Sequence, residues 1–193
     1  MTDSTIYKYV IKLFLALSLL LLAATSFAKG PVRSIDGLVT KISDGDTIQV
    51  TDSLGTKVKV RFYGIDCPET EKSNRKTDRV SKEGQPYGEE AYRVLQGKLQ
   101  RQRVRLDVMD IDRYGRTVSI VWLNNRNINL EMVANGWAWA YTQYLDRPHA
   151  SEYLQAEEQA RQAKKGLWQQ NNPQPPWEFR KQQKKGNHGR ETW

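Results

Sequence analysis

The chain has 193 residues, a formal net charge of +8, two histidines and a single cysteine, Cys67. One cysteine excludes an intrachain disulfide, so the folded part must depend on its apolar core, and two widely separated histidines exclude a histidine-rich zinc site. The positive charge favours a polyanionic partner, either nucleic acid or an acidic membrane surface, although solubility alone would also explain it.

The N-terminal segment has the pattern of an export signal. Lys8 and Lys12 precede an apolar run over residues 13–24, and Ser26-Phe27-Ala28 is a small-x-small cleavage site. The apolar run is shorter than the roughly 20 residues that a transmembrane helix needs. We therefore expect residues 1–28 to be a signal peptide and the mature protein to be periplasmic or secreted. An uncleaved N-terminal membrane anchor is the alternative.

Three strands are expected close together after residue 35. Apolar and polar side chains alternate over residues 47–51 and again over residues 58–63. Residues 38–42 precede them as a further strand, followed by the turn-forming pair Asp44-Gly45. The sequence therefore predicts an antiparallel meander of three strands.

The middle of the chain predicts a loop, a helix and two more strands. Residues 69–86 are polar and lack periodicity, which predicts a mobile surface loop. Apolar residues then recur at helical spacing from residue 89 to residue 99. Alternation returns over residues 103–108 and 116–123, which we expect to be the fourth and fifth strands.

Two further helices and a tail complete the chain. A short helix is expected over residues 129–135, and a longer one from a cap at Ser151 to a stop at Gly166, with Lys164 and Lys165 in its last turn. Proline, glutamine and lysine dominate from residue 169 onward, so residues 169–193 are expected to be a disordered, basic tail.

Five strands and about three helices within residues 29–168 predict a mainly β, α+β domain. The first three strands lie too close together for the crossover helices of an α/β sheet, because parallel neighbours need a dozen or more residues between them. A five-stranded, OB-like barrel is therefore the predicted fold.

Acidic and basic residues cluster where strands begin or end. If the barrel brings these ends together, three carboxylates (Asp46, Asp66 and Glu69) and a backbone carbonyl would face Arg61 and Arg116. Such hard oxygen ligands suit Ca²⁺ or Mg²⁺, and guanidinium groups bind phosphate oxygens. A metal with two arginines can stabilise the charge that develops on a phosphate during displacement, and a carboxylate can activate water.

Four motifs in order resemble those of the thermonuclease (micrococcal nuclease) family. They are Asp-Gly-Asp-Thr over residues 44–47, Val-Arg-Phe-Tyr-Gly-Ile-Asp-Cys-Pro-Glu-Thr over 60–70, Tyr-Gly-Glu-Glu-Ala over 87–91 and Asp-Arg-Tyr-Gly-Arg over 112–116. The similarity covers roughly residues 35–168. The resemblance implies a Ca²⁺-dependent nuclease that cleaves DNA and RNA with little sequence preference, breaking the bond to the 5′ oxygen and leaving 3′-phosphorylated products.

The resemblance also implies a role for each matching residue. Asp46, Asp66 and the carbonyl of Cys67 would bind Ca²⁺, with Asp44 supporting them, and Glu69 would orient or deprotonate the attacking water. The arginines that would hold the phosphate and stabilise the transition state are Arg61 and Arg116. The residues that would contact the rest of the substrate are Arg113, Tyr114 and Tyr141.

Two alternatives to a nuclease remain open at this point. The first is a noncatalytic OB-type module that binds single strands through basic and aromatic side chains. The second, supported only by the N-terminal segment, is a membrane-tethered structural protein. The leading interpretation implies a monomer that acts on DNA and RNA, without a stable protein partner and without membrane contact once the signal is removed.

Overall fold

Five strands close into a barrel in this computed structural model, which describes residues 30–74, 76–77, 79–145 and 147–188. The barrel strands are β1 (Arg33–Asp44), β2 (Thr47–Asp52), β3 (Lys57–Phe62), β7 (Arg103–Ile111) and β8 (Thr117–Leu123). They pair in the order β3-β2-β1-β7-β8. A parallel pairing of β3 with β8, in which Val60 lies opposite Thr117, closes the barrel. The predicted OB-like barrel and its initial three-stranded meander are confirmed.

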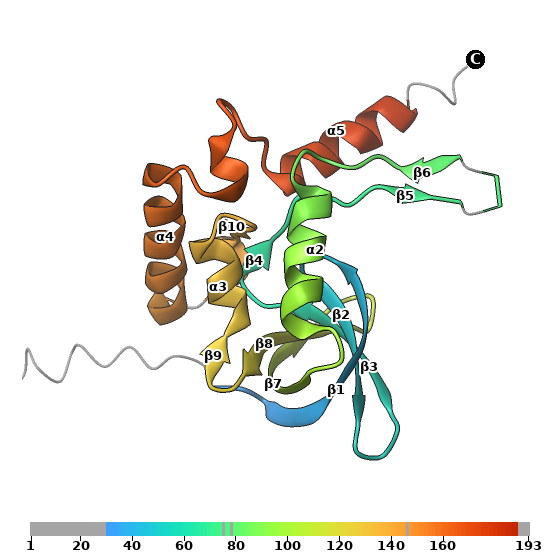
Figure 1. The fold of residues 1–193 in the computed structure, drawn as a ribbon, viewed down its shortest axis with the longest axis vertical. Helices are drawn as coiled ribbons and strands as arrows, with labels where there is room; N and C mark the ends of the chain where they lie inside the picture. The colour runs from blue at the N-terminus through green and yellow to red at the C-terminus, as the bar shows by residue number, and fades with distance from the viewer. Residues whose placement is uncertain (1–29, 75, 78, 146, 189–193) are drawn as a thin grey trace, which may run out of the picture.

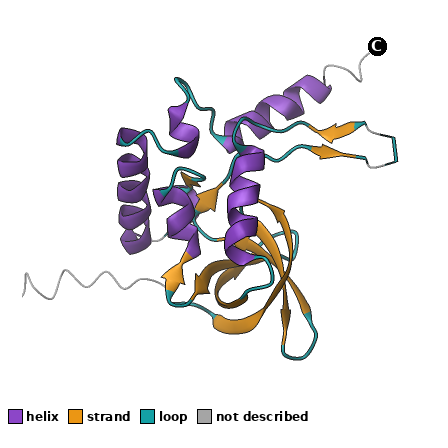
Figure 2. Cartoon of the chain, viewed as in Figure 1, coloured by secondary structure: helices purple, strands orange, loops and turns teal. Residues whose placement is uncertain are grey.

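The described part of the chain has four helices (Figures 1 and 2). They are α2 (Gly88–Leu99), α3 (Ile128–Ala134), α4 (Arg147–Gln162) and α5 (Pro176–His188), with short 3-10 turns η1 (Thr142–Tyr144) and η2 (Gly166–Gln169). Short strands add three local pairings. They are β4 (Ile65–Asp66) with β10 (Trp139–Ala140), β5 (Lys72–Ser73) with β6 (Val80–Lys82), and β9 (Arg126–Asn127) with β8.

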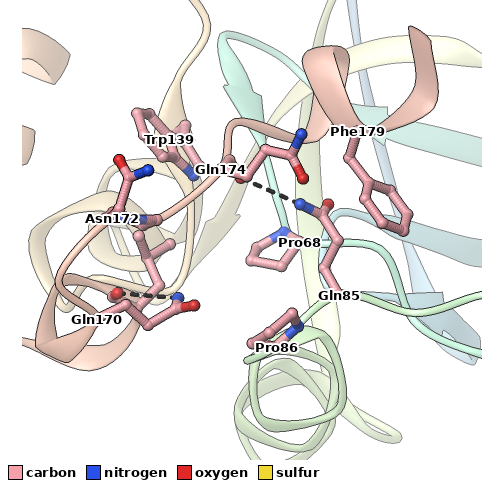
Figure 3. A pocket seen from close by; sticks show the side chains of 10 residues that line it. Pro68, Gln85, Pro86, Trp139, Gln170, Asn172, Gln174 and Phe179 are labelled. Carbon is pink, nitrogen blue, oxygen red and sulfur yellow. Dashed lines mark hydrogen bonds between the residues drawn. The ribbon is translucent and has the colours of Figure 1, made fainter. Parts of the chain in front are cut away.

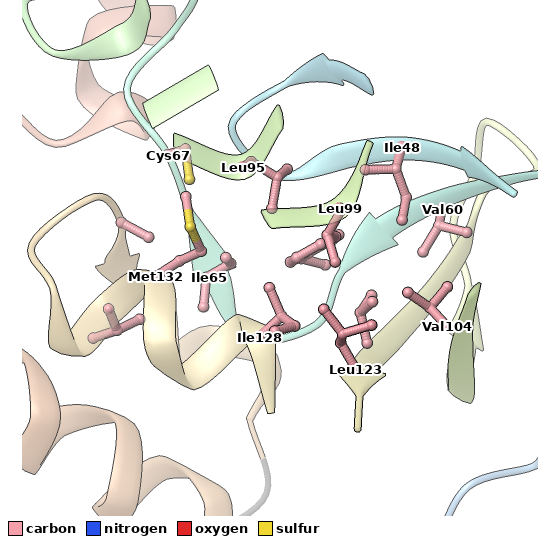
Figure 4. Close-up of a cluster of buried hydrophobic side chains, with 14 of the residues drawn as sticks. Ile48, Val60, Ile65, Cys67, Leu95, Leu99, Val104, Leu123, Ile128 and Met132 are labelled. Carbon is pink, nitrogen blue, oxygen red and sulfur yellow. The ribbon is translucent and has the colours of Figure 1, made fainter. Parts of the chain in front are cut away.

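The core fills the barrel and the space beneath α2 and α3 (Figure 4). Ile48 and Val60 point inward from adjacent strands, and Leu95 and Leu99 of α2 meet them from one end; all four side chains are at most 1% exposed. Burying an aliphatic side chain of this size stabilises the fold by about 1.5–3 kcal/mol. The alternation seen in the sequence thus corresponds to inward and outward faces of the barrel strands.

Two expectations for the loops and helices need correction. Residues 69–86, predicted as an irregular loop, contain the β5–β6 hairpin, in which Lys72 lies opposite Lys82. Both strands are exposed on both sides, so they lack the alternation that marks a half-buried strand. Helix α4 begins at Arg147, upstream of the predicted cap Ser151, since a proline in the first helical turn is well tolerated there.

The ends of α4 and of the chain also differ from expectation. Lys164 adopts a left-handed conformation (φ 47°), so α4 ends at Gln162 and Lys164 and Lys165 lie beyond its last turn. Residues 176–188, predicted to be disordered, form α5.

The expected signal peptide, residues 1–28, lies outside the described residues. Within the described ranges, no helix combines the length and the apolar character that crossing a bilayer requires.

Candidate active site

The acidic residues of the predicted site lie where three strands end near the start of α2. Asp44 and Asp46 flank the β1–β2 turn, Asp66 ends the short strand β4, and Glu69 follows three residues later. Gly45 lets the two segments meet, because a Cβ on this residue would lie 2.8 Å from the Cβ of Cys67. Strand pairing and a tight backbone contact therefore bring together carboxylates that are about 20 residues apart.

Arg61 joins the two aspartates. It stands on β3 opposite Thr47, and its two terminal nitrogens form ion pairs with Oδ1 of Asp46 and Oδ1 of Asp66. Both aspartates are almost completely buried, at 2% and 0% exposed. Asp46 also accepts the backbone N–H of Cys67 through Oδ2 over 2.9 Å.

Glu69 is the third carboxylate of the group. It is 8% exposed and pairs with Lys82 of β6 and, over 2.8 Å, with Nη1 of Arg180 from α5. Its backbone is held by two neighbours: its N–H donates to Oε1 of Gln85 over 3.1 Å, and its carbonyl packs against Gly88 at the start of α2. These contacts place Glu69 beside Asp66 and fix its direction.

The local charges shift the pKa values of the group. Burial raises the pKa of Asp46 well above its usual value, with Asp44 and Asp66 adding to this effect and Arg61 opposing it. Burial alone would also raise the pKa of Glu69, but the hydrogen bonds from Arg180 and Lys82 outweigh it and lower this pKa. Burial would lower the pKa of Arg61, yet the surrounding carboxylates raise it, so this guanidinium stays charged.

The second predicted arginine stands on the β7–β8 hairpin. Nε of Arg116 donates to Oδ2 of Asp112 over 2.7 Å, and Oδ1 of Asp112 accepts the backbone N–H groups of Tyr114 and Arg116. Arg61 lies opposite Val118 in the parallel β3–β8 pair, and Arg116 precedes Val118 by two residues. Arg116 therefore lies just before the first residue of β8, beside the strand segment that pairs with Arg61.

The predicted substrate contacts fall in two places. Tyr114 is 68% exposed at the hairpin tip, where the guanidinium groups of Arg113 and Arg116 lie 4.9 and 5.5 Å from its ring centroid. Tyr141 follows β10, and its N–H donates to the carbonyl of Gly64 over 2.8 Å, just before β4. Tyr141 therefore lies next to the strand that carries Asp66.

Comparisons with known proteins identify the family of this chain. The model of the family described as "Staphylococcal nuclease homologue" matches residues 59–170. A Haemophilus influenzae protein named "Uncharacterized endonuclease" is 40% identical over 146 residues, which cover 76% of this chain and 73% of that protein. The chain belongs to the staphylococcal nuclease family.

Two further relatives differ in how much of their own length the match covers. A Shigella flexneri protein named "Micrococcal nuclease" is 35% identical over 77% of this chain and 82% of its own length. A probable staphylococcal-like nuclease of Oryza sativa subsp. japonica is 34% identical over 80% of this chain but only 43% of its own length, so the plant protein is much longer. The residues matched by the family model begin within β3 and end after η2, before α5.

The carboxylates of this nuclease face cations of the chain itself. Among the described residues, no group of three or more His, Cys, Asp or Glu side chains is arranged to hold a metal ion. The oxygens of Asp66 instead contact Arg61 and Arg180, and those of Glu69 contact Lys82 and Arg180. Carboxylate oxygens are the kind of ligand that a hard divalent cation takes, and in this structure positive side chains of the chain already contact them.

Two members of this cluster, Lys82 and Arg180, were not predicted from the sequence. Both lie in segments interpreted as solvated or disordered. A signal for α5 does exist, since Pro176 is a favoured first residue of a helix and Trp177 and Arg180 are spaced three apart. The contact of Arg180 with Asp66 spans 114 residues, however, and no local pattern reveals it.

Proposed function

We propose that this protein is a Ca²⁺-dependent nuclease that hydrolyses DNA and RNA with little sequence preference. The observation that carries the proposal is the convergence of Asp46, Asp66 and Glu69 with Arg61 at one end of the barrel. Family membership supports the hydrolysis of phosphodiester bonds. The relative named "Micrococcal nuclease" supports nucleic acid as the substrate.

Asp46, Asp66 and the backbone carbonyl of Cys67 would hold Ca²⁺, with Asp44 supporting this group from the β1–β2 turn. A bound Ca²⁺ supplies positive charge for the phosphate oxygens as they become more negative. Asp46 is well suited to this role because its position is already fixed by the N–H of Cys67. The chain thus contributes two carboxylates and a carbonyl, which are hard ligands of the kind that Ca²⁺ prefers.

Glu69 would orient the attacking water and accept its proton. The water oxygen forms a new bond to phosphorus while the bond from phosphorus to the 5′ oxygen breaks, and the leaving 5′ oxygen takes up a proton. Arg61 and Arg116 would bind the phosphate and stabilise its five-coordinate transition state. Arg113, Tyr114 and Tyr141 would contact the adjoining phosphate and base, and the product would carry a 3′-phosphate.

A chelation-controlled digest tests this function. The purified protein is incubated with end-labelled single-stranded DNA or RNA while free Ca²⁺ is titrated against EGTA, and the end groups of the products are identified. We expect cleavage of both substrates that depends on free Ca²⁺ and leaves 3′-phosphates. Cleavage that persists in excess EGTA would refute the role of Ca²⁺, and tight binding without shortening would favour the noncatalytic single-strand-binding module.

We also propose that the protein acts outside the cytoplasm. The support is the sequence of residues 1–28, whose basic start, apolar run and small-x-small end are typical of a cleaved signal. N-terminal sequencing of the exported protein should find Lys29 as the first residue. A start upstream of the apolar run would favour the membrane anchor instead.

A further inference from the structure

Helix α5 lies against the acidic cluster although it is remote from it in sequence. It begins at Pro176, beyond the residues that match the family model, and runs beside the β5–β6 hairpin (Figure 1). Nε2 of Gln183 donates to Oε2 of Glu83 over 2.6 Å, which ties the helix to this hairpin. The helix is therefore an addition to the barrel with its own specific docking contacts.

Arg180 makes the central contact of α5. Its Nη2 lies 2.7 Å from Oδ2 of Asp66, and its Nη1 lies 3.1 Å from Oδ1 of Asp66 and 2.8 Å from Oε1 of Glu69. Its side chain is 35% exposed, whereas the carboxylates are 1% and 10% exposed. One guanidinium thus covers both oxygens of a proposed metal ligand and one oxygen of the proposed base.

Trp177 covers a second part of the site. It lies one helical turn before Arg180 and hence on the same face of α5. Its ring centroid lies 5.2 Å from that of Tyr141, at an interplanar angle of 32°, and 5.7 Å from that of Trp139. The ring of Tyr141, a proposed contact for the base, is therefore covered in part by this tryptophan.

The segment that leads into α5 is also docked. Nε2 of Gln85 donates to the carbonyl of Gln174 over 3.0 Å (Figure 3). Gln85 is the same side chain that accepts the backbone N–H of Glu69. Phe179 lines a pocket of about 190 Å³ together with Pro68 and Pro86 (Figure 3). The helix is thus held by aromatic, polar and ionic contacts around the segment from Asp66 to Glu69.

We propose that α5 is an autoinhibitory plug, in which Arg180 stands in for the metal cation and Trp177 stands in for a stacked base. This inference rests on the proposed function, since it assigns Asp66 and Glu69 to the active site. Guanidinium and Ca²⁺ compete for the same carboxylate oxygens, so loading the site with metal and substrate requires α5 to move away. In the resting protein, α5 then prevents unregulated cleavage of nucleic acid. Binding of Ca²⁺ together with nucleic acid displaces the helix.

The fold does not require Arg180. When α5 leaves, Asp66 keeps its ion pair with Arg61, and Glu69 keeps its ion pair with Lys82. The variant Arg180→Gln should therefore fold with a melting temperature close to that of the wild type. Lys181→Gln is a matched control, because it removes the same charge from an exposed neighbour on α5.

The first test measures Ca²⁺ binding by titration calorimetry without nucleic acid. We expect Arg180→Gln to bind Ca²⁺ about tenfold more tightly than the wild type, which corresponds to about 1.4 kcal/mol. The affinity of Lys181→Gln should stay within about twofold of the wild type, which is the size of a lost exposed charge. Equal affinities of all three proteins would overturn the plug.

The second test uses wild-type protein and hydrogen exchange resolved by mass spectrometry. We expect Ca²⁺ to increase exchange in peptides from residues 176–188, while the barrel strands keep their protection. Unchanged or increased protection of α5 in Ca²⁺ would contradict the proposal. So would an Arg180→Gln variant with wild-type Ca²⁺ affinity and reduced cleavage, because Arg180 would then belong to the phosphate-binding set.

The proposed nuclease function and the proposed plug can be refuted separately. If all three proteins bind Ca²⁺ equally and cleave DNA, the plug is wrong and the proposed nuclease stands. If no variant binds Ca²⁺ or cleaves DNA, both the proposed function and the plug are wrong. Tighter Ca²⁺ binding by Arg180→Gln, together with Ca²⁺-induced exchange in α5, would support both.

Discussion

The backbone N–H of Cys67 donates to Oδ2 of Asp46 over 2.9 Å, which locks the segment after β4 onto the β1–β2 turn. The thiol of Cys67 contacts the same turn, where Sγ donates to the carbonyl of Gly45 over 3.1 Å. The residue thus acts through its backbone, while its side chain fills space beneath the site. A neighbouring thiol would be a hazard to a metal site only if it were accessible.

We predict that this thiol is unreactive in the folded protein. It is 4% exposed, and burial raises its pKa well above the usual value, with Asp46 adding to this shift. Because the thiolate is the reactive form, native Cys67 should react with an aromatic disulfide reagent at pH 8 at least about 100-fold more slowly than in urea-unfolded protein. Similar rates in the two states would show that the site opens readily and that oxidation is a real risk.

Arg61 and Arg116 should differ in their effect on stability. Removing Arg61 takes the ion pair away from buried Asp46 and leaves Asp66 paired with Arg180 alone, so Arg61→Ala should lower the free energy of unfolding by about 3 kcal/mol. Arg116→Ala removes a partly exposed ion pair and should cost at most about 1 kcal/mol. Both should reduce DNA cleavage by at least about 100-fold, because both guanidiniums would stabilise the transition state.

Urea denaturation and cleavage rates check this contrast, with the exposed Arg93→Ala as a control for loss of charge. An Arg116→Ala variant that cleaves at the wild-type rate would remove the β7–β8 hairpin from the catalytic machinery.

Gly88 is predicted to position Glu69. A Cβ on Gly88 would lie 2.2 Å from the carbonyl oxygen of Glu69, so Gly88→Ala must displace this segment. Since small misplacements of a catalytic group can cost about 100-fold, we expect cleavage to fall at least about tenfold. Gly97→Ala, in the same helix with no atom within 4 Å of its Cβ, should keep full activity and gain up to about 1 kcal/mol of stability. Equal activities of the two variants would contradict this role.

Asn129 is predicted to be the strongest polar contributor to stability outside the active site. Its side chain is fully buried and accepts the N–H of Val121, while its amide donates to the carbonyls of Tyr63 and Ser119. Asn129→Leu would remove these three hydrogen bonds, although the carbonyl of Ser119 keeps the N–H of Tyr63 as a donor, and should cost about 2–4 kcal/mol. Asn135→Ala, at the exposed end of the same helix, should cost less than about 1 kcal/mol in the same urea titration.

Much of the barrel could be predicted because its strands are half-buried. Ile48 and Val60 face the core while their neighbours face solvent, and this difference appears directly as alternation in the sequence. Strands β5 and β6 gave no such signal, since both of their faces are exposed. The site aspartates, Arg61 and Glu69 were found from their motifs, and the structure brings these residues together.

The docking of α5 could not be predicted in the same way. Its composition is polar and rich in lysine and glutamine, which is also typical of disorder, and only Trp177, Phe179 and Arg180 distinguish it. Their partners are Tyr141, the pocket beside Pro68, and Asp66, all distant in sequence. A local pattern does not contain such long-range contacts, so the helix and its contacts with the site emerge only from the three-dimensional structure.

The most direct test of the central claim is the turnover of single-stranded DNA by Asp66→Asn at saturating Ca²⁺. This isosteric change keeps one acceptor oxygen for Arg61, replaces the oxygen that faces Arg180 with an NH2 group, and removes one negative charge from the proposed metal site. We predict a melting temperature within a few degrees of the wild type and a fall in turnover of at least about 1,000-fold. Turnover within threefold of the wild type would show that the acidic cluster at Asp66 is not the hydrolytic centre.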